Sequence, residues 1–212
     1  LFVAPSVVWR QQNYSAFVES ERVARFRVTD AEARFDVGYE IGNVAEFRAG
    51  VYRGGGEARV KVGDPSIANF DFEAGGLYAQ IGVDTLDNAY FPHTGWLANL
   101  RWTNSLESFG ADANFDTIES QLMRAWTRGK STLSLALYYA TTLEAQSNVQ
   151  DYFPLGGFLR MSGRERGETA GPHAALARAV YYRRVGDSAG GLFELPVYLG
   201  ASLEAGNAWL SR

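Results

Sequence analysis

The chain has 212 residues, a net charge of −4 at pH 7 and no cysteine. The lack of cysteine excludes disulfide bonds and thiol catalysis, and the acidic balance provides no broad basic field for nucleic acid. Hydrophobic residues make up 46% of the chain and aromatic residues 14%. This composition is enough for one sizeable folded unit and favours β-strands or a membrane interface.

Both ends of the sequence predict a fragment of a longer protein. Residues 1–10 contain no initiator methionine and no basic segment followed by an apolar run, as a signal peptide would. Residues 208–212 read like the close of a strand with nothing after it. The longest uncharged stretches, such as 131–143, span about 13 residues, fewer than the roughly 18 that a membrane-spanning helix needs. If the chain meets a membrane, we expect it to cross as strands.

Apolar and polar residues alternate along most of the chain, which is the pattern of strands with one apolar and one polar face. Between 31 and 41, for example, Phe35, Val37 and Tyr39 share one face, while Arg34 and Asp36 share the other. In chain order, strands with clear alternation are expected at 31–41, 45–52, 57–62, 77–84, 96–103, 132–139 and 193–205. Weaker strands are expected at 2–9, 14–19, 22–29, 115–127 and 174–183. The sequence therefore predicts about twelve strands and no helix.

The connections between these segments alternate in length. Short turns are expected at 29–30, 53–56 and 127–130, and longer connections at 63–69, 104–114 and 144–172. Because successive antiparallel strands reverse direction, every second connection lies at the same edge of a sheet. One edge should therefore carry tight turns and the other long loops.

The two predicted faces differ in a way that indicates a membrane barrel. The polar faces carry dense charge of both signs, and the opposite faces carry small and aliphatic residues. Aromatic residues recur near the predicted strand ends, at Trp9, Tyr39, Trp96, Trp102, Trp126 and Trp209. An apolar outer band, aromatic girdles and a wet lumen are typical of transmembrane barrels. The sequence therefore predicts an all-β, antiparallel transmembrane β-barrel, with a soluble β-sandwich, whose strands also alternate, as the alternative.

Residues 84–95, DTLDNAYFPHTG, have the composition of a turn, in which Pro92 fixes φ and Gly95 relaxes the entry into the next strand. The string resembles the D-x-x-x-N-x-x-F-P-x-x-G signature of the BamA/TamA/FhaC superfamily of outer-membrane assembly and secretion barrels, also called the bacterial surface antigen family. The matching residues are Asp84, Asn88, Phe91, Pro92 and Gly95. The resemblance implies a turn on the periplasmic side of a barrel in the bacterial outer membrane.

The long connection is the second point of resemblance. In that superfamily the sixth extracellular loop folds back into the lumen and carries G-G followed by V-R-G-F or V-R-G-Y. The matching residues here are Gly156, Gly157, Phe158, Arg160 and Gly163. Met161 and Ser162 depart from the pattern, because they stand between the arginine and the later glycine, and no aromatic follows. This variant resembles the barrels of patatin-like phospholipase autotransporters, in which a lipase domain precedes the barrel.

A third resemblance lies in the last strand, where Glu204, Gly206 and Trp209 match the family pattern F-x-D/E-x-G-x-x-W. Alternation independently places Glu204 on the polar face. In the superfamily the loop arginine pairs with the acidic residue at this position, which implies an ion pair between Arg160 and Glu204 in the lumen. A bidentate pair of this kind would hold the loop in place. The alternative is that both are solvated lumen charges.

The resemblance also implies the organisation of the chain. Residues 1–212 would form one barrel domain truncated at both ends, with 144–172 as the inward-folded extracellular loop. If that loop is the sixth extracellular one, about twelve strands would run from the second to the thirteenth strand of a sixteen-stranded barrel.

The sequence contains no G-x-S-x-G, H-E-x-x-H or P-loop motif, so we expect no catalytic, metal or cofactor site. His93 and His173 are expected to be polar loop residues. The resemblance implies an outer-membrane barrel that anchors and exports or displays an attached patatin-like phospholipase. The alternatives are an assembly or two-partner secretion pore and, from another class, a soluble β-rich binding domain. The expected partners are outer-membrane lipids, an attached or secreted polypeptide passenger, the barrel-assembly machinery and, in a homo-oligomer, a second copy of the chain.

Overall fold

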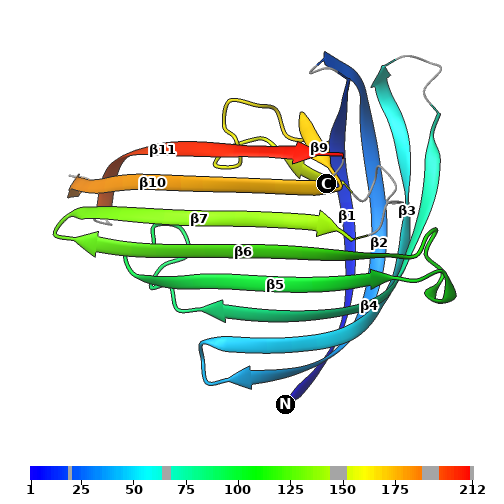
Figure 1. Ribbon diagram of the computed structural model, residues 1–212, viewed down its shortest axis with the longest axis horizontal. Coiled ribbons are helices and arrows are strands. Elements are labelled where there is room, and N and C mark those ends of the chain that lie inside the picture. The colour runs from blue at the N-terminus through cyan, green and yellow to red at the C-terminus, as the bar shows by residue number, and fades with distance from the viewer. Residues whose placement is uncertain (19–20, 64–67, 144–151, 188–195, 211–212) are drawn as a thin grey trace.

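The computed structural model describes residues 1–18, 21–63, 68–143, 152–187 and 196–210. Within these ranges, nine strands form one antiparallel sheet whose neighbours follow chain order (Figure 1). They are β1 (Phe2–Val18), β2 (Glu21–Ile41), β3 (Ala45–Gly63), β4 (Phe70–Asp84), β5 (Gly95–Ser105), β6 (Phe115–Arg128), β7 (Ser131–Thr142), β10 (His173–Asp187) and β11 (Pro196–Trp209). A separate two-stranded sheet joins β8 (Phe153–Leu155) to β9 (Thr169–Gly171), and η1 (Glu107–Phe109) is one turn of 3-10 helix. The all-β antiparallel prediction is confirmed.

The strand connections lie at two edges of the sheet, and we name each edge by its most prominent connection. Among the described residues, the turn edge carries 42–44, 85–94 and 129–130, and the loop edge carries 106–114 and 152–172. The predicted turn at 127–130 is confirmed, with Gly129 at a φ of 63° in a two-residue hairpin. The 84–95 motif and the long loop therefore lie at opposite edges of the sheet.

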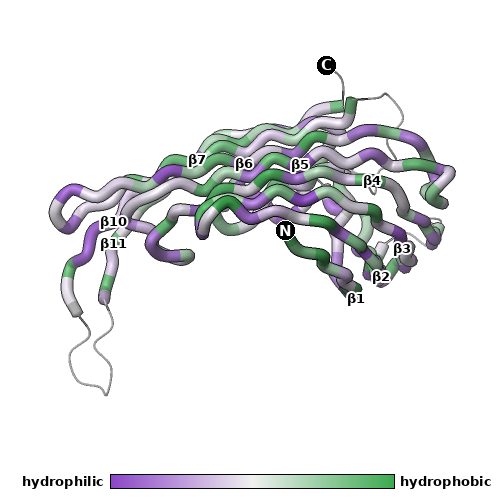
Figure 2. The backbone as a smooth tube through the Cα atoms, turned by 90° about the horizontal axis from the view of Figure 1, so that it is seen from below, coloured by the Kyte–Doolittle hydropathy of each residue, from purple (hydrophilic) through white to green (hydrophobic). Residues whose placement is uncertain are grey.

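The exposed face of the sheet is apolar, which reverses the arrangement of a soluble protein. On β7, Leu133, Leu135 and Leu137 are 37%, 42% and 56% exposed, whereas the alternating residues Thr132, Ser134 and Ala136 are buried. Figure 2 shows hydrophobic and hydrophilic residues alternating along the strands. We call the leucine-bearing side of the sheet the outer face and the opposite side the inner face. An apolar outer face over a polar inner face is the arrangement that suits lipid outside and water inside.

The outer face changes character part-way along β2. Phe35 and Val37 face outward in the segment 31–41, whereas the outward positions nearer the loop edge hold Arg25 and Arg27. The outward ion pair Arg59–Asp71 (2.8 Å) on β3 and β4 lies at the level of Arg27, and the outward pair Arg53–Glu73 (2.6 Å) lies beside Ala33 and Ala31. The apolar part of β2 is thus about 11 residues long, the length with which a tilted strand crosses a membrane. Beyond it, the outward positions are polar.

The change of polarity along the outer face explains why, in the described part of the chain, the main sheet has nine strands where twelve strands were expected. β1, β2 and β3 each run without interruption through a segment where a break was predicted. Residues 29–30 and 53–56 pair with both neighbouring strands instead of turning. For the same reason the expected faces of 57–62 are reversed, because Ala58 is buried while Glu57 and Arg59 face outward. With the long loop still counted as the sixth extracellular one, β1 becomes the fifth strand of the barrel instead of the second.

Two of the tryptophans lie near strand ends at the turn edge, which is where an aromatic girdle would lie. Trp96 begins the outward row of β5, and Trp126 lies near the end of β6 at the turn edge. Trp9 is in the middle of β1, not near a strand end as predicted, but it pairs with Ala31, where the apolar band ends. Among the described residues, no helix is long and apolar enough to cross a membrane.

Candidate functional site

The described part of the long loop, 152–172, lies on the inner face, against β10 and β11 (Figure 1). Leu155 in β8 is fully buried and packs against Ala174 and Leu176 of β10. Tyr138 of β7 and Ala208 of β11 border the same cluster. Burial of a leucine side chain stabilises by about 1.5–3 kcal/mol. The loop is therefore anchored to the wall by an apolar contact as well as by the polar contacts that follow.

The paired glycines shape the turn that returns the loop to its own start. Gly156 and Gly157 have φ angles of 121° and 93°, which side-chain-bearing residues rarely adopt. Their N–H groups donate to the carbonyl oxygens of Arg160 (2.7 Å) and Arg164 (2.9 Å). A Cβ on Gly156 would collide with the carbonyl oxygen of Glu165. Glycine is thus required at 156 by both conformation and space.

The other two residues of the predicted loop motif have no such constraint. Phe158 is 87% exposed and does not pack. Gly163 has no positive φ, and a Cβ there would meet nothing within 4 Å. The match to the family pattern at these positions therefore has no evident structural reason in this chain.

Glu204 on β11 holds the tip of the loop, through the two residues that depart from the family pattern. The N–H groups of Met161 and Ser162 donate to Oε2 of Glu204 at 2.7 and 2.8 Å. The Ser162 hydroxyl donates to Oε1 at 2.9 Å, and the hydroxyl of Ser202 to the same oxygen at 3.1 Å. Met161 has a φ of 78°, a strained value for this residue type. We call this set of contacts the Glu204 latch.

The predicted Arg160–Glu204 ion pair is corrected by this geometry. The Arg160 guanidinium lies 4.8 Å from the centre of the Tyr138 ring, and within the described ranges no ion pair joins it to Glu204. The arginine nearer to the latch is Arg178, which is in register with Glu204 and donates to the carbonyl oxygen of Leu159 at 2.9 Å. The insertion of two residues moves Arg160 past the carboxylate and places backbone N–H groups there instead.

The far side of the loop reaches the first strands of the sheet. Arg22, at the start of β2, forms an ion pair with Glu165 at 3.1 Å. Both side chains are well exposed, so the pair stabilises by at most about 1 kcal/mol. The ion pair shows how far the loop extends. The loop contacts the inner face at β7, β10 and β11, and through Glu165 it also reaches β2 at the opposite end of the sheet.

The 84–95 turn uses its motif residues to build itself. Asp84 Oδ1 accepts the N–H of Leu86 at 2.9 Å. Asn88 Oδ1 accepts the N–H groups of Tyr90 and Phe91 at 2.8 and 2.9 Å. Gly95 has a φ of 110°, and a Cβ there would collide with the carbonyl oxygen of Thr85. These capping contacts are the ones that Asp and Asn side chains make in turns.

The same turn docks on strands more than 80 residues away. Phe91 stacks on Tyr198 of β11 with ring centres 4.9 Å apart, and the Tyr182 hydroxyl of β10 donates to the carbonyl oxygen of Pro92. His93 Nε2 lies 3.0 Å from the Tyr198 hydroxyl. Both tyrosines share the inner face with Glu204, because even-numbered residues of β10 and β11 point that way. One wall of two strands therefore holds the turn near one edge and the loop near the other.

Sequence reasoning missed Tyr182 and Tyr198, because nothing in the alternation relates them to a distant turn. Asp87, which with Asn88 was expected to initiate the turn, lies within it. Asp87 accepts the N–H groups of His93 and Thr94 at 2.7 and 3.0 Å. Burial tends to raise the pKa of Asp87, but these hydrogen bonds and the nearby His93 ring together hold the pKa below its usual value.

The lowered pKa predicts an acid-sensitive turn. A carboxylate whose pKa is lower in the folded state stabilises fully above its unfolded pKa of about 3.9 and loses that contribution as pH falls through the folded value. We expect the Asp87→Asn variant to be less stable than the parent at neutral pH, with the difference shrinking below about pH 4. Urea unfolding of both proteins across pH measures it, and a difference that stays constant down to pH 2 would contradict this role for Asp87.

The remaining predicted site residues lie at the loop edge of β11. Gly206 brings the backbone of β11 close to β10, because a Cβ there would lie 2.7 Å from the carbonyl oxygen of Ala175. Trp209 ends the strand with its ring centre 5.9 Å from that of His173. His173 begins β10 and is buried, with Nδ1 2.8 Å from the Thr141 hydroxyl, so it is not the loop residue expected. In the described part of the chain, no three His, Asp or Glu side chains are grouped to hold a metal ion.

Comparisons with known proteins agree with the architecture described above. The Omp85 superfamily domain matches residues 2–192. The crystal structure of BamA from Haemophilus ducreyi lacking POTRA domains 1–3 is similar in fold, with a TM-score of 0.73 over 98% of this chain at 12% sequence identity. The chain spans 46% of the length of that BamA chain. The search of curated proteins found no match. At this level of identity, the likeness to BamA shows the fold alone.

Proposed function

Because the chain belongs to the Omp85 superfamily, we propose that it is the barrel region of an outer-membrane protein that inserts polypeptides into the membrane or moves them across it. The fold is that of a BamA-like outer-membrane barrel. The observation that carries the proposal is the Glu204 latch, by which a loop on the polar inner face is held to the barrel wall.

The chemistry of the latch suits a removable plug. The Glu204 carboxylate accepts two backbone N–H groups and the hydroxyl of Ser162. Water or the N–H groups of an incoming polypeptide can replace such donors. Hydrogen bonds to a charged group contribute about 1.5–3 kcal/mol each, and exposure to lumen water reduces their sum. Opening the latch therefore costs far less than unfolding the barrel. The loop could yield to a substrate while the sheet stays intact.

A reversible bridge tests this role. The chain has no native cysteine, so Ser162→Cys with Ser202→Cys can link the loop to β11 through an oxidisable pair in the full-length protein. Both native hydroxyls donate to Oε1 of Glu204. We expect oxidation to stop polypeptide insertion or export in cells that depend on this protein, and a reductant to restore it. Full transport by the bridged protein would contradict the proposal, and Ser162→Cys alone is the control.

A finer proposal concerns the passenger. The Met161-Ser162 step resembles that of patatin-like phospholipase autotransporters and supports an attached lipase, exported or displayed by the barrel. In this chain the step also has a local role, because both residues hold Glu204. The sequence preceding Leu1 in the full-length protein separates the two readings. A G-x-S-x-G domain with serine-dependent phospholipase activity supports the autotransporter, and several periplasmic modules without it support an assembly or secretion pore.

The soluble binding domain is the least supported alternative. Its strands would have to leave a continuous apolar face in water, including Leu135 and Leu137 of β7 and Leu199 and Leu203 of β11, which are 42%, 56%, 70% and 79% exposed. Monomeric soluble proteins rarely expose such patches. Two results together would favour the soluble binding domain: the full-length protein would partition into the aqueous phase without detergent, and it would show no heat-modifiable gel mobility.

A further inference from the structure

Arg124 of β6 is a charged residue in the middle of an apolar surface. It pairs with Trp96 on β5 and Leu135 on β7, which places it on the outer face. Its guanidinium lies 4.3 Å from the ring centre of Trp96 and 5.4 Å from that of Trp126. In the part of the chain that the structure describes, no carboxylate forms an ion pair with it. The rings thus hold an exposed cation on the outer face.

Arg124 lies at the depth in the membrane where lipid head groups are expected. Trp96 and Trp126 belong to the aromatic girdle near the turn edge, where tryptophan marks the boundary between acyl chains and head groups. At this depth an arginine facing lipid is tolerated far better than at the midplane. Phosphate is the anion that best matches the planar fork of a guanidinium. Outward basic residues continue toward the turn edge, with Arg128 ending β6 and Arg183 on β10, so an anionic lipid is favoured.

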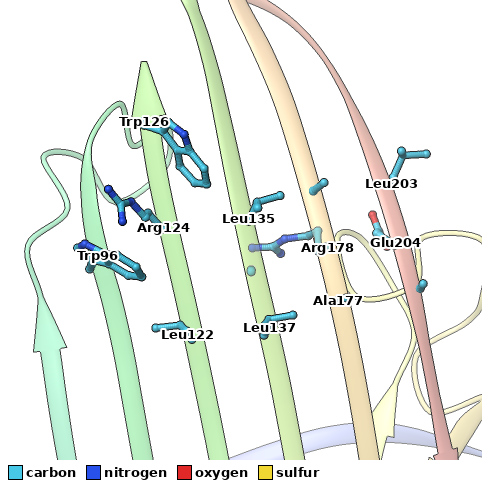
Figure 3. Close-up of a pocket in the computed structure, with 13 residues that line it drawn as sticks. Trp96, Leu122, Arg124, Trp126, Leu135, Leu137, Ala177, Arg178, Leu203 and Glu204 are labelled. Carbon is cyan, nitrogen blue, oxygen red and sulfur yellow. The ribbon is translucent and has the colours of Figure 1, made fainter. Parts of the chain in front are cut away.

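A groove lies beside this cation on the same face. It has a volume of about 720 Å³ and continues from Trp96, Arg124 and Trp126 across β7 to β10 and β11 (Figure 3). Ala177 and Ala179 line it on β10. The register places Leu135, Ala179 and Leu203 at the level of Arg124, so small side chains lie between two large ones. An acyl chain fits over alanines flanked by leucines.

We propose that this surface binds an anionic phospholipid, with the phosphate on Arg124 between the two tryptophans and an acyl chain in the alanine-floored groove. The proposal rests on the membrane location of the outer face, not on polypeptide transport. A transport-inactive barrel would still bind the lipid, and a barrel that binds no such lipid could still transport. An experiment can therefore contradict the lipid-binding proposal without contradicting the transport proposal, and the reverse.

Native mass spectrometry of the detergent-solubilised full-length protein tests the site, with phosphatidylglycerol, phosphatidylcholine or inorganic phosphate added. We expect phosphatidylglycerol to bind more tightly than phosphatidylcholine, and Arg124→Gln to weaken phosphatidylglycerol binding about tenfold, a loss of about 1.4 kcal/mol. Arg128→Gln, on the same strand and face, should change the affinity for phosphatidylglycerol less than about threefold. Ala177→Leu should weaken binding by filling the groove, whereas Ala201→Leu, an outward residue of β11 outside the groove, should not.

Three results would overturn the proposal: equal binding of the two lipids, an Arg124→Gln variant that binds like the parent, or displacement of the lipid by millimolar inorganic phosphate. Heat-modifiable gel mobility shows whether each variant is folded. All four substituted side chains point to the outer face, whereas the side chain of Glu204, a residue that also borders the groove, points to the inner face with the latch. A folded variant that loses lipid binding therefore reports on the outer side of the groove.

Discussion

The Gly156→Ala variant should release the inward loop, with a loss of docking free energy of about 2–3 kcal/mol. The new Cβ would force a residue with a φ of 121° into an unfavourable conformation and collide with the carbonyl oxygen of Glu165. The turn that presents Met161 and Ser162 to Glu204 would then be displaced. Trypsin cleavage after Arg164 or Arg166 measures the change, because cleavage of a transiently opened segment tracks the population of the open form.

Gly163→Ala is the matched control for this prediction. It adds the same methyl group seven positions further along the same loop, where φ is not positive and no atom lies within 4 Å of the new Cβ. We expect its docking free energy to stay within about 0.5 kcal/mol of the parent. Equal protease sensitivity of the two variants would show that the Gly156 turn does not govern loop docking.

The Glu204→Ala variant should have the second large effect, with a loss of about 2–3 kcal/mol in loop docking. Removal of the carboxylate leaves the Met161 and Ser162 N–H groups and the Ser162 hydroxyl without their acceptor. Hydrogen bonds to a charged group contribute about 1.5–3 kcal/mol, and exposure to lumen water reduces the sum of several such bonds. Glu204→Gln, which keeps one carbonyl oxygen as acceptor, should lose less. The same trypsin assay provides the comparison.

Double-mutant cycles identify the partner of Glu204. Ser162→Ala combined with Glu204→Ala should be non-additive, because the two side chains are hydrogen-bonded. Arg160→Ala combined with Glu204→Ala should be additive, because Arg160 lies over the Tyr138 ring instead. Strong coupling of Arg160 to Glu204, with none for Ser162, would restore the ion pair that the family resemblance implies.

The alternation of residues was sufficient to predict the class of fold, because lipid outside and water inside impose opposite polarities on the two sides of every strand. It was not sufficient to predict the number of strands. The same alternation reverses phase where a strand leaves the membrane, as at Asp30 on β2 and Gly56 on β3. A glycine run at such a point resembles a turn in sequence. Only pairing with both neighbouring strands distinguishes a strand that leaves the membrane from one that ends.

The site was predicted in its parts but not in its contacts. The positions of Glu204 and of the loop glycines followed from alternation and resemblance. In the turn, Asn88 accepts two backbone N–H groups and Gly95 has a positive φ. The partner of Glu204 could not be predicted, because a two-residue insertion decides which group reaches the carboxylate. The docking of Phe91 on Tyr198 joins residues more than 100 positions apart, and strand periodicity carries no signal at that range.

Loop and turn share a supporting wall, since β10 and β11 carry both Glu204 and the pair Tyr182 and Tyr198. The connection from the long loop enters β10 directly at His173. The loop and the turn are therefore attached to the same two strands, near opposite edges of the sheet. This arrangement gives the two motifs of the chain a common physical basis.

The most direct test of the Glu204 latch is thiol cross-linking in the folded full-length barrel. The chain has no cysteine, so only introduced pairs can react. Ser162→Cys with Ser202→Cys should be joined rapidly by a short bifunctional thiol reagent, because both native hydroxyls contact Oε1 of Glu204. Ser162→Cys with Ser120→Cys should react slowly, because Ser120 pairs with the outward-facing Tyr139 and therefore lies on the outer face, across the sheet from the loop. Equal rates for the two pairs, or no link between 162 and 202 in the folded barrel, would contradict a latched inward loop.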